Sequence, residues 1–277
     1  MATTIFIDDP ADPSLADFRD LTHADRRPDR PAGTGLVIAE GVPVVQRLLA
    51  SPYRVRAVLG VASRIEALAP YLVSLRAPVY VASTEVMAQT VGFHLNRGVL
   101  ASADRLPARS VEEIVGAAQR IAVLEGVNDH ENLGSIFRNA AALGVEAVLL
   151  GPGCADPLYR RAVRVSMGHV LSVPFTELAG SPRFAAWPTA LSGLQSTGFS
   201  VLALTPRPGS VALHDVDPAM HPCSAVLVGA EGPGLSEEAL GAADLAVRIP
   251  MRPGVDSVNV ATAAAIAFAH LSPDWSD

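Results

Sequence analysis

Apolar and polar residues follow one another along most of the chain in short blocks that predict strands and helices in turn. In the first third, strands are expected at 35–40 and 55–61, with a helix over 43–49 between them. Pro43 suits the first turn of that helix, where an amide hydrogen would have no partner in any case. Further elements are expected at 64–75 (helix), 79–82 (strand), 84 onward (short helix) and 97–101 (strand). The pattern predicts a small α/β domain over residues 35–103.

The alternation resumes beyond a linker and helix start at 104–116, in which Ser110-Val-Glu-Glu113 has the form of a capping box. Strands are expected at 120–124, 145–150, 170–175, 200–204, 225–228 and 245–249, and helices at 133–143, 157–165, 188–195 and, capped by Ser257, up to about 271. Such alternation predicts a parallel sheet covered by helices on both faces, over 117–277. Residues 1–34, rich in Asp, Arg and Pro, are expected to form a surface extension.

Composition narrows the class of protein. The chain has 277 residues, 49% of them hydrophobic, which is enough for two domains with sizeable cores. No apolar run approaches the roughly 20 residues that cross a bilayer, and the N-terminus lacks the pattern of a signal peptide, so a cytoplasmic protein without membrane contact is expected. Cys154 and Cys223 lie far apart, and His130-Glu131 lacks a second histidine at zinc-binding spacing, so no metal site is predicted.

The net charge of -7 argues against wholesale coating of nucleic acid, but it leaves room for a local basic face. All 21 basic residues are arginines, which suits bidentate contacts with phosphate and equally suits a genome that favours arginine codons. The candidate RNA contacts are Arg160, Arg161 and Arg164 on one predicted helix and Arg26, Arg27 and Arg30 in the extension. Solvated surface positions are the alternative for both groups.

Three polar blocks each follow a predicted strand, where ligands bind in open α/β sheets. The first block, 128–144, places Asn132 in a loop and Arg138 about 9 Å farther along a helix. The second block has three glycines around Glu231, and glycines let a ligand approach the backbone closely. It matches neither the phosphate-binding P-loop nor the dinucleotide fingerprint, and a carboxylate favours a cationic or hydroxyl-rich ligand. The third block, 249–259, carries Ser257 and Asn259 in front of an Ala-rich helix.

Each block alone also fits a structural role: a capped helix with a solvated arginine, a tight turn in which Glu231 caps the next helix, and a packing helix capped by Ser257. Together they form a specific combination. Asn-x-Gly-x-x-x-Arg, Val-Gly-x-Glu-Gly-x-Gly and Ile-Pro-Met-x-x-x-x-x-Ser-x-Asn-Val resemble the three motifs of the SpoU (TrmH-like) RNA 2′-O-ribose methyltransferases, over about 120–271. The domain at 35–103 resembles the ribosomal-protein-like, RNA substrate-binding domain often fused ahead of this catalytic domain.

The resemblance implies a trefoil knot in the second domain, S-adenosylmethionine as cofactor, RNA as partner and a homodimer. It implies that Gly229, Ile249 and Val258 hold the cofactor through main-chain groups and apolar walls, and we expect Leu204 and Thr205 beside them. Arg138 is expected to act at the ribose 2′-hydroxyl and its phosphate. The residues expected to orient it and line the pocket are Asn132, Glu231, Ser257 and Asn259. An arginine stays protonated below a pH of about 12, so electrostatic stabilisation suits Arg138 better than the role of a base.

The resemblance therefore predicts S-adenosylmethionine-dependent 2′-O-ribose methylation of RNA. Ribosomal RNA is expected ahead of transfer RNA, because the two-domain layout resembles the rRNA-modifying members. A non-catalytic RNA-binding or ribosome-assembly factor that keeps the fold is the alternative from another class, although the complete polar set argues against it. An unrelated nucleotide-binding enzyme is disfavoured because the glycine fingerprint is absent. The motifs name neither the nucleotide nor a housekeeping or antibiotic-resistance role.

Overall fold

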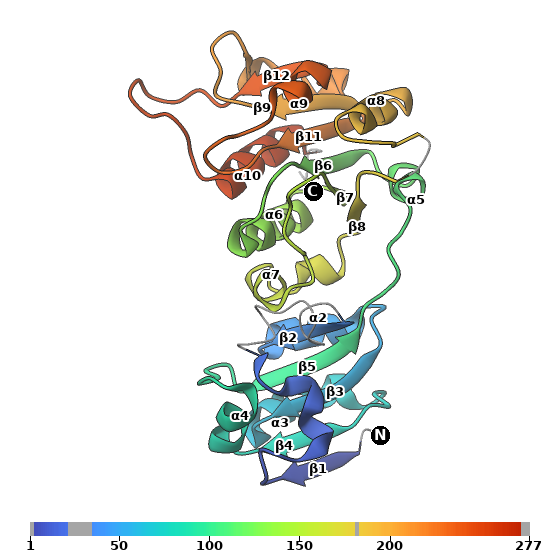
Figure 1. The fold of residues 1–277 in the computed structure, drawn as a ribbon, viewed down its shortest axis with the longest axis vertical. Helices are drawn as coiled ribbons and strands as arrows, with labels where there is room; N and C mark the ends of the chain where they lie inside the picture. The colour runs from blue at the N-terminus through green and yellow to red at the C-terminus, as the bar shows by residue number, and fades with distance from the viewer. Residues whose placement is uncertain (1–2, 22–34, 181–182, 273–277) are drawn as a thin grey trace. The chain divides into compact units, whose positions relative to one another are not determined.

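The computed structural model describes residues 3–21, 35–180 and 183–272. They form two compact units, each with its own sheet (Figure 1). The first unit combines Met1–Pro107 with Asp156–Ser172, and the second combines Ala108–Ala155 with Val173–Asp277. The segment 156–172, which we expected within the second domain, thus groups with the first unit. None of the helices formed by these residues is both long and apolar enough to span a membrane.

The sheet of the first unit has the order β1-β4-β3-β5-β2 and is mixed. Its strands are β1 (Thr4–Ile7), β2 (Leu36–Glu40), β3 (Val55–Gly60), β4 (Val79–Ala82) and β5 (Val99–Asp104). β1, β4 and β3 are parallel, whereas β5 is antiparallel to both β3 and β2. Residues 92–98 return the chain to the sheet edge where β3 ends, with Gly60 opposite Val99, so β5 runs in reverse. The first unit is thus an α/β domain, as expected, and its sheet is mixed.

The first residues of the chain belong to this sheet and its core. β1 pairs with β4 along its whole length, and the 3-10 helix η1 (Pro13–Phe18) buries Leu15 and Phe18 completely. The prediction of a surface extension over 1–34 was therefore wrong for 4–18, because a four-residue strand is too short to give a periodic signal. The expected RNA contacts Arg26, Arg27 and Arg30 lie outside the described residues.

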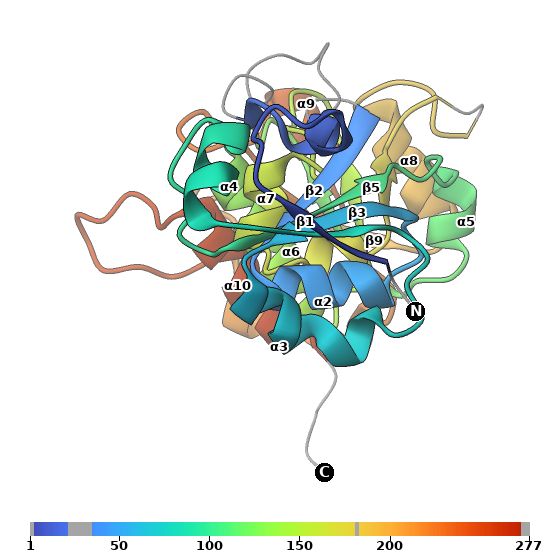
Figure 2. The ribbon, with the colours of Figure 1, turned by 90° about the horizontal axis from the view of Figure 1, so that it is seen from below.

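Helices cover both faces of the first sheet, as Figure 2 shows. α2 (Val42–Ala50) and α3 (Ala62–Leu72) lie on one face, while η1 and α4 (Thr84–Val91) lie on the other, where they share a buried cluster with Ile38 and Leu59. α3 begins two residues before and ends three residues before the expected 64–75. α7 (Arg160–Val165) packs against β2 and is followed by the 3-10 helix η3 (His169–Leu171), where a strand had been expected.

The sheet of the second unit has seven strands in the order β10-β12-β9-β11-β6-β7-β8, and every pair is parallel. The strands are β6 (Arg120–Leu124), β7 (Ala147–Leu150), β8 (Phe175–Glu177), β9 (Ser200–Leu204), β10 (Val211–Ala212), β11 (Ser224–Val228) and β12 (Leu245–Arg248). The predicted parallel α/β sheet is confirmed here. β10 was not expected, and the expected strand at 170–175 begins only at Phe175. The trefoil knot stays a prediction.

Helices also cover both faces of the second sheet (Figure 1). α5 (Val111–Val115), α8 (Thr189–Ser196) and α9 (Glu237–Ala242) share one buried cluster with Ile121 and Val123, and α5 opens with the predicted capping box at Ser110. α6 (His130–Ala142) and α10 (Val260–Leu271) pack together on the other face, with Ala264 and Ala267 fully buried. The expectation that the Ala-rich helix packs closely against another element is confirmed. Two 3-10 helices, η4 (Leu213–Asp215) and η5 (Pro218–Met220), follow β10.

Candidate active site

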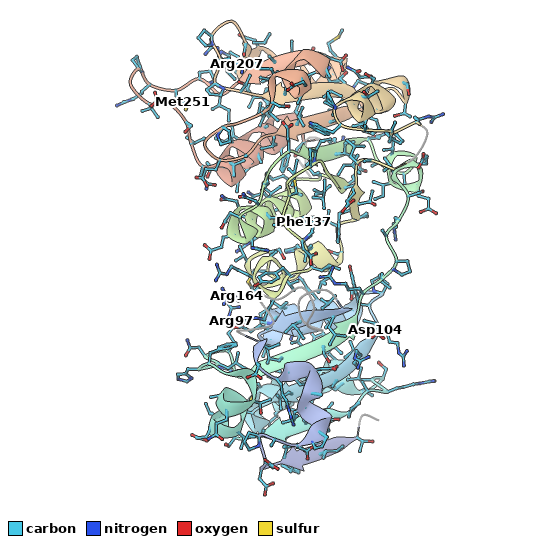
Figure 3. All side chains as sticks on the ribbon, viewed as in Figure 1. Arg97, Asp104, Phe137, Arg164, Arg207 and Met251 are labelled. Atoms are coloured by element: carbon cyan, nitrogen blue, oxygen red, sulfur yellow. The ribbon has the colours of Figure 1, made fainter. Side chains whose placement is uncertain are left out.

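The strands of the second unit end at one edge of the sheet, and the loops that follow them carry the predicted site residues. β12, β9 and β11 are neighbours in this sheet. Leu204 ends β9 and Thr205 follows it, while Gly229 follows β11 and Ile249 follows β12, so these four residues share this edge. Four of the five predicted cofactor residues thus lie at neighbouring strand ends. Val258 lies in the loop between β12 and α10, which projects from the second unit and carries Met251 (Figures 1 and 3).

A hydrogen-bonded chain joins the three polar blocks. Asn132 Nδ2 donates to Glu231 Oε2 at 2.9 Å, and Asn259 Nδ2 donates to Asn132 Oδ1 at 2.8 Å. The direction of these bonds is fixed at both ends, because an ionised carboxylate can only accept and because Asn259 Oδ1 accepts from the amides of Ala261 and Thr262. The structure therefore brings together three of the five predicted catalytic residues.

Asn259, and not Ser257, is the N-cap of α10. Its Oδ1 lies 2.9 Å from the amide nitrogen of Ala261 and 3.3 Å from that of Thr262. The expected cap at Ser257 was wrong, because serine and asparagine cap equally well and residue type alone does not choose between two positions so close together. Ser257 lies exposed in the projecting loop. The Oδ1 atom of Asn259 thus caps α10, while its Nδ2 atom donates to Asn132.

The start of α6 fixes the position of Asn132. The Asp129 carboxylate accepts from the amides of Glu131 at 2.9 Å and of Asn132 at 2.8 Å, so that α6 begins at His130, three residues before the expected start. Asn132 therefore lies in the first turn of the helix and not in the preceding loop, which corrects our expectation. A capped first turn holds the side chain that links Glu231 to Asn259.

Arg138 lies on a different face of α6 from Asn132. Six residues of helix turn the side chain by about 120° and move it about 9 Å along the axis. Its neighbour Phe137 is fully buried and packs edge-on against Phe175, with ring centroids 5.6 Å apart, whereas Arg138 is exposed (Figure 3 labels Phe137). Neither Arg138 nor Ser257 has a side-chain hydrogen bond to any residue that the structure describes. The structure does not bring these two into the Asn132 cluster.

Gly229 is required by the packing of its own loop. A Cβ atom added there would lie 2.4 Å from Gly234 C and from Leu235 N, which are backbone atoms. Ala230 and Gly234 form an antiparallel bridge, and Gly232 and Gly234 have φ of 91° and 74°. The tight turn that we weighed as an alternative is thus present. It does not make Glu231 a helix cap, because Ser236 Oγ caps α9 by accepting from the Ala239 amide.

Glu125, which follows β6, was missed by the motif analysis. Its buried carboxylate accepts from Trp187 Nε1 at 2.7 Å, from the Ser236 amide at 2.9 Å and from the Ser236 hydroxyl at 2.7 Å. It thereby ties the end of the Glu231 loop to the strand that precedes Asn132. An acidic residue directly after a buried apolar strand was the signal that could have revealed it.

Asn139 was missed as well, although it supports the start of α10. Its Nδ2 donates to the Ala261 carbonyl at 2.9 Å. Asn132 and Asn139 are seven residues apart and therefore lie on one face of α6. Both anchor the beginning of α10, which keeps Asn259 in place.

Charged and thiol side chains near the strand ends have identifiable partners. Arg207, in the loop after β9, forms a two-fold ion pair with Glu237 at the start of α9 (Figure 3 labels Arg207). The hydrogen bond from Arg207 lowers the pKa of Glu237, and the same bond raises the pKa of Arg207. Burial raises the pKa of the Cys154 thiol, whose Sγ donates to the Leu124 carbonyl at 3.3 Å. Among the described residues, no cluster of His, Cys, Asp and Glu could hold a metal ion.

Of the predicted RNA contacts, Arg160 is engaged inside the first unit. Its Nη1 lies 2.8 Å from Glu40 Oε2, and its guanidinium carbon lies 4.7 Å from the centroid of the Phe93 ring. Arg164 and Arg97 each approach the same carboxylate at 3.9 Å (Figure 3). Arg160 therefore balances the charge of a buried glutamate, whereas Arg161 is exposed and its RNA contact stays a prediction.

The polar loops of the second unit meet at the carboxyl edge of a parallel sheet. Ligands bind at this edge in open α/β sheets, so the second unit is an α/β domain with a ligand-binding site. Its family follows from comparison with known proteins. The profile of the SpoU rRNA Methylase family matches residues 119–269. An uncharacterized tRNA/rRNA methyltransferase of Mycobacterium tuberculosis is 58% identical over 261 residues, or 94% of this chain and 88% of that protein. The chain belongs to the SpoU rRNA Methylase family and is an RNA methyltransferase.

Two further comparisons concern a named methyltransferase and a solved structure. The 23S rRNA (guanosine(2553)-2'-O)-methyltransferase of Bacillus subtilis is 31% identical over 160 residues, which are 58% of this chain and 60% of that protein. The solved structure of an AdoMet-bound rRNA methyltransferase from Sinorhizobium meliloti has a TM-score of 0.78, with 24% identity and coverage of 97% of each chain. At this identity, the second comparison supports the fold alone.

Proposed function

We propose that this protein transfers a methyl group from S-adenosylmethionine to a ribose 2′-hydroxyl of ribosomal RNA. The observation that carries the proposal is the hydrogen-bonded chain from Glu231 through Asn132 to Asn259, which unites the three motif loops at one edge of the sheet. The name of the Bacillus subtilis relative supports both the 2′-oxygen and ribosomal RNA. Transfer RNA is the alternative substrate, since the Mycobacterium tuberculosis relative is named for both.

The residues at the strand ends fit S-adenosylmethionine. Leu204, Gly229 and Ile249 offer main-chain groups and hydrocarbon, Thr205 adds a hydroxyl, and Val258 supplies an apolar side chain from the projecting loop. Pockets for nucleoside cofactors combine apolar walls with a few fixed polar groups, and these residues have that character. When bound, the cofactor supplies an electrophilic methyl group on a cationic sulfonium. The Glu231 carboxylate favours a cation near this edge.

The chain's own residues must then stabilise the 2′-oxygen as its proton passes to the adjacent phosphate or to water. An arginine side chain carries a fixed positive charge, so we assign Arg138 the stabilisation of the developing alkoxide and the adjacent phosphate. Its exposure on α6 leaves the guanidinium accessible to RNA. Asn132 and Asn259 order the pocket through their hydrogen bonds, and Glu231 anchors that network. Ser257 joins the site from the projecting loop in this proposal.

We further propose that the protein is a cytoplasmic homodimer. Ile266 on α10 is 38% exposed, and Val255 in the loop before it is 50% exposed. Apolar side chains gathered at one helix and its preceding loop favour burial against a second copy. Sedimentation equilibrium tests this part, and a monomer at micromolar concentration would contradict it.

A single-turnover assay tests the catalytic assignment. With saturating donor and ribosomal RNA from a strain that lacks the gene, Arg138→Ala should slow methyl transfer by about 10²-fold or more, because a positively charged stabiliser of the transition state is lost. Donor affinity should stay unchanged. Arg109→Ala, at an exposed position before α5, serves as the matched control and should transfer at the normal rate. Near-normal transfer by Arg138→Ala would refute its role.

Mapping 2′-O-methyl groups tests the substrate. Ribosomal and transfer RNA from the deletion strain are compared with RNA from its parent. Loss of one 2′-O-methyl group from ribosomal RNA is the expected result, and a loss confined to transfer RNA would select the alternative. Unchanged methylation of both, with normal donor binding, would favour a non-catalytic RNA-binding factor.

A further inference from the structure

The first unit contains a cleft of about 610 Å³ at the edge where β1, β3 and β4 end. Ile7, Val61 and Val81 give it apolar walls, and α3 and α4 begin immediately beside it. Phe6, on the edge strand β1, stands at the rim with 79% of its surface exposed. A cavity of this size accommodates a nucleotide-sized ligand, and a solvent-exposed aromatic ring offers it a flat apolar surface.

The polar side chains of the cleft are the carboxylates of Asp8 and Glu85 and the hydroxyls of Ser83 and Thr84, and none of its lining residues is an arginine, lysine or histidine. Asp8 directly follows the last residue of β1, and it lines the cleft together with Phe6. Hydrogen bonds from its own amide and from Ser83 lower the pKa of Glu85 and keep this carboxylate ionised. The carboxylates of Asp8 and Glu85 favour a flat group that carries N–H donors.

One cationic side chain lies beside the cleft without lining it. A Cβ atom added to Gly98 would lie 3.3 Å from both Arg64 Cγ and Val61 Cγ2, so the Arg64 stem lies beside an apolar wall of the cleft. Arg97, which precedes Gly98, extends instead toward Glu40 at the end of β2. The first unit as a whole contains 14 arginines against 12 carboxylates, whereas the second contains seven against 16. The phosphates of an RNA are thus attracted to the first unit.

We propose that this cleft binds an unpaired guanine of the RNA substrate, with the base against Phe6, its donor edge on Asp8 and its phosphate on Arg64. Guanine presents N1–H and the 2-amino group side by side, which matches the two oxygens of one carboxylate. The base must be unpaired, because only then is this edge free and the ring able to stack on an aromatic side chain. The inference rests on the proposed function in one respect, namely that RNA is the substrate.

Fluorescence anisotropy with the full-length protein tests the proposal. The probes are fluorescein-labelled single-stranded RNA nonamers of uridine with one central guanosine or, instead, inosine, which lacks the 2-amino group. The wild type should bind the guanosine probe about tenfold more tightly, because one hydrogen bond to a charged group is lost with inosine. Asp8→Asn and Phe6→Ala should each remove this preference.

Arginine variants separate the phosphate contact from the base contact. Arg64→Ala should weaken binding of both probes equally and reduce the dependence of affinity on salt. Arg54→Ala is the matched control, because Arg54 is exposed and pairs at 3.8 Å with Asp104, at the opposite end of β5 from Arg97 (Figure 3). It should leave both affinities and the salt dependence unchanged.

Three results would overturn the proposal: equal binding of the two probes by the wild type, a guanosine preference that survives Asp8→Asn and Phe6→Ala, or Asp8-dependent binding of a basic nonapeptide in place of RNA. A parallel methyl-transfer assay distinguishes this failure from failure of the proposed function. Methylation without guanosine preference overturns only the proposed guanine site in the cleft. Guanosine preference without any methyl transfer overturns the proposed function alone.

Discussion

At the residue scale, one side chain serves two purposes that a substitution can separate. Asn259 Oδ1 caps α10, while Asn259 Nδ2 donates to Asn132. Asn259→Asp keeps the capping oxygen but turns the donor into an acceptor that faces another acceptor. We expect the free energy of unfolding to stay within about 0.5 kcal/mol of the wild type, because aspartate caps as well as asparagine. Methyl transfer should fall at least about tenfold, because the hydrogen bond to Asn132 becomes a repulsion between two acceptors.

Urea unfolding and single-turnover transfer measure the two effects of Asn259→Asp independently. Asn259→Ala provides the comparison, since it removes the cap as well and should cost about 1 kcal/mol of stability. Wild-type transfer by Asn259→Asp would show that the bond to Asn132 has no part in the reaction.

The convergence of Asn132, Glu231 and Asn259 could be predicted from the sequence, because each follows a strand of one parallel sheet. The place of Arg138 could not. Its position along α6 was known, but the rotation of the helix is set by the burial of Phe137 against Phe175, a contact between distant residues. Glu125 was also beyond motif analysis, since its partners Trp187 and Ser236 come from two other connections.

At the element scale, the conformation of the loop after β11 requires a residue without a side chain at position 229. In Gly229→Ala, the new Cβ would meet backbone atoms of the same loop at 2.4 Å, which no side-chain rotation relieves. The loop must shift, and Glu231 shifts with it. We expect a loss of about 1–3 kcal/mol in unfolding free energy and a weaker affinity for S-adenosylmethionine, measured by urea unfolding and by calorimetry. Gly241→Ala in α9, where an added Cβ has nothing within 4 Å, is the control and should be neutral or stabilising.

The strands themselves were predictable to the extent that they are long and buried. β6, β7, β9 and β11 are runs of apolar residues that lie almost wholly in the core. β1 and β10, with four and two residues, are too short for a periodic signal. The reversed direction of β5 had no signal at all, because periodicity is the same for parallel and antiparallel strands.

At the scale of the whole molecule, the chain crosses between the two units three times, because Asp156–Ser172 belongs to the first unit although β7 and β8, on either side, belong to the second. This segment supplies α7, whose Arg160 pairs with the buried Glu40 of β2. A fragment ending at Pro107 therefore lacks part of its own core. We expect residues 1–107 alone to unfold at lower urea than residues 1–107 joined to 156–172 by a flexible glycine–serine linker.

The difference in stability between the two fragments depends on the ion pair of Glu40 as well as on buried apolar surface. In the linked fragment, Arg160→Met should lose at least about 2 kcal/mol of stability, because it leaves a buried carboxylate without its closest cation. Arg161→Met, one residue along on the exposed side of α7, should lose almost nothing. If the fragment 1–107 were as stable as the linked one, α7 would add no stability to the first unit and would only connect β7 to β8. If it is not, the first unit cannot be separated from the second by a single cut in the chain.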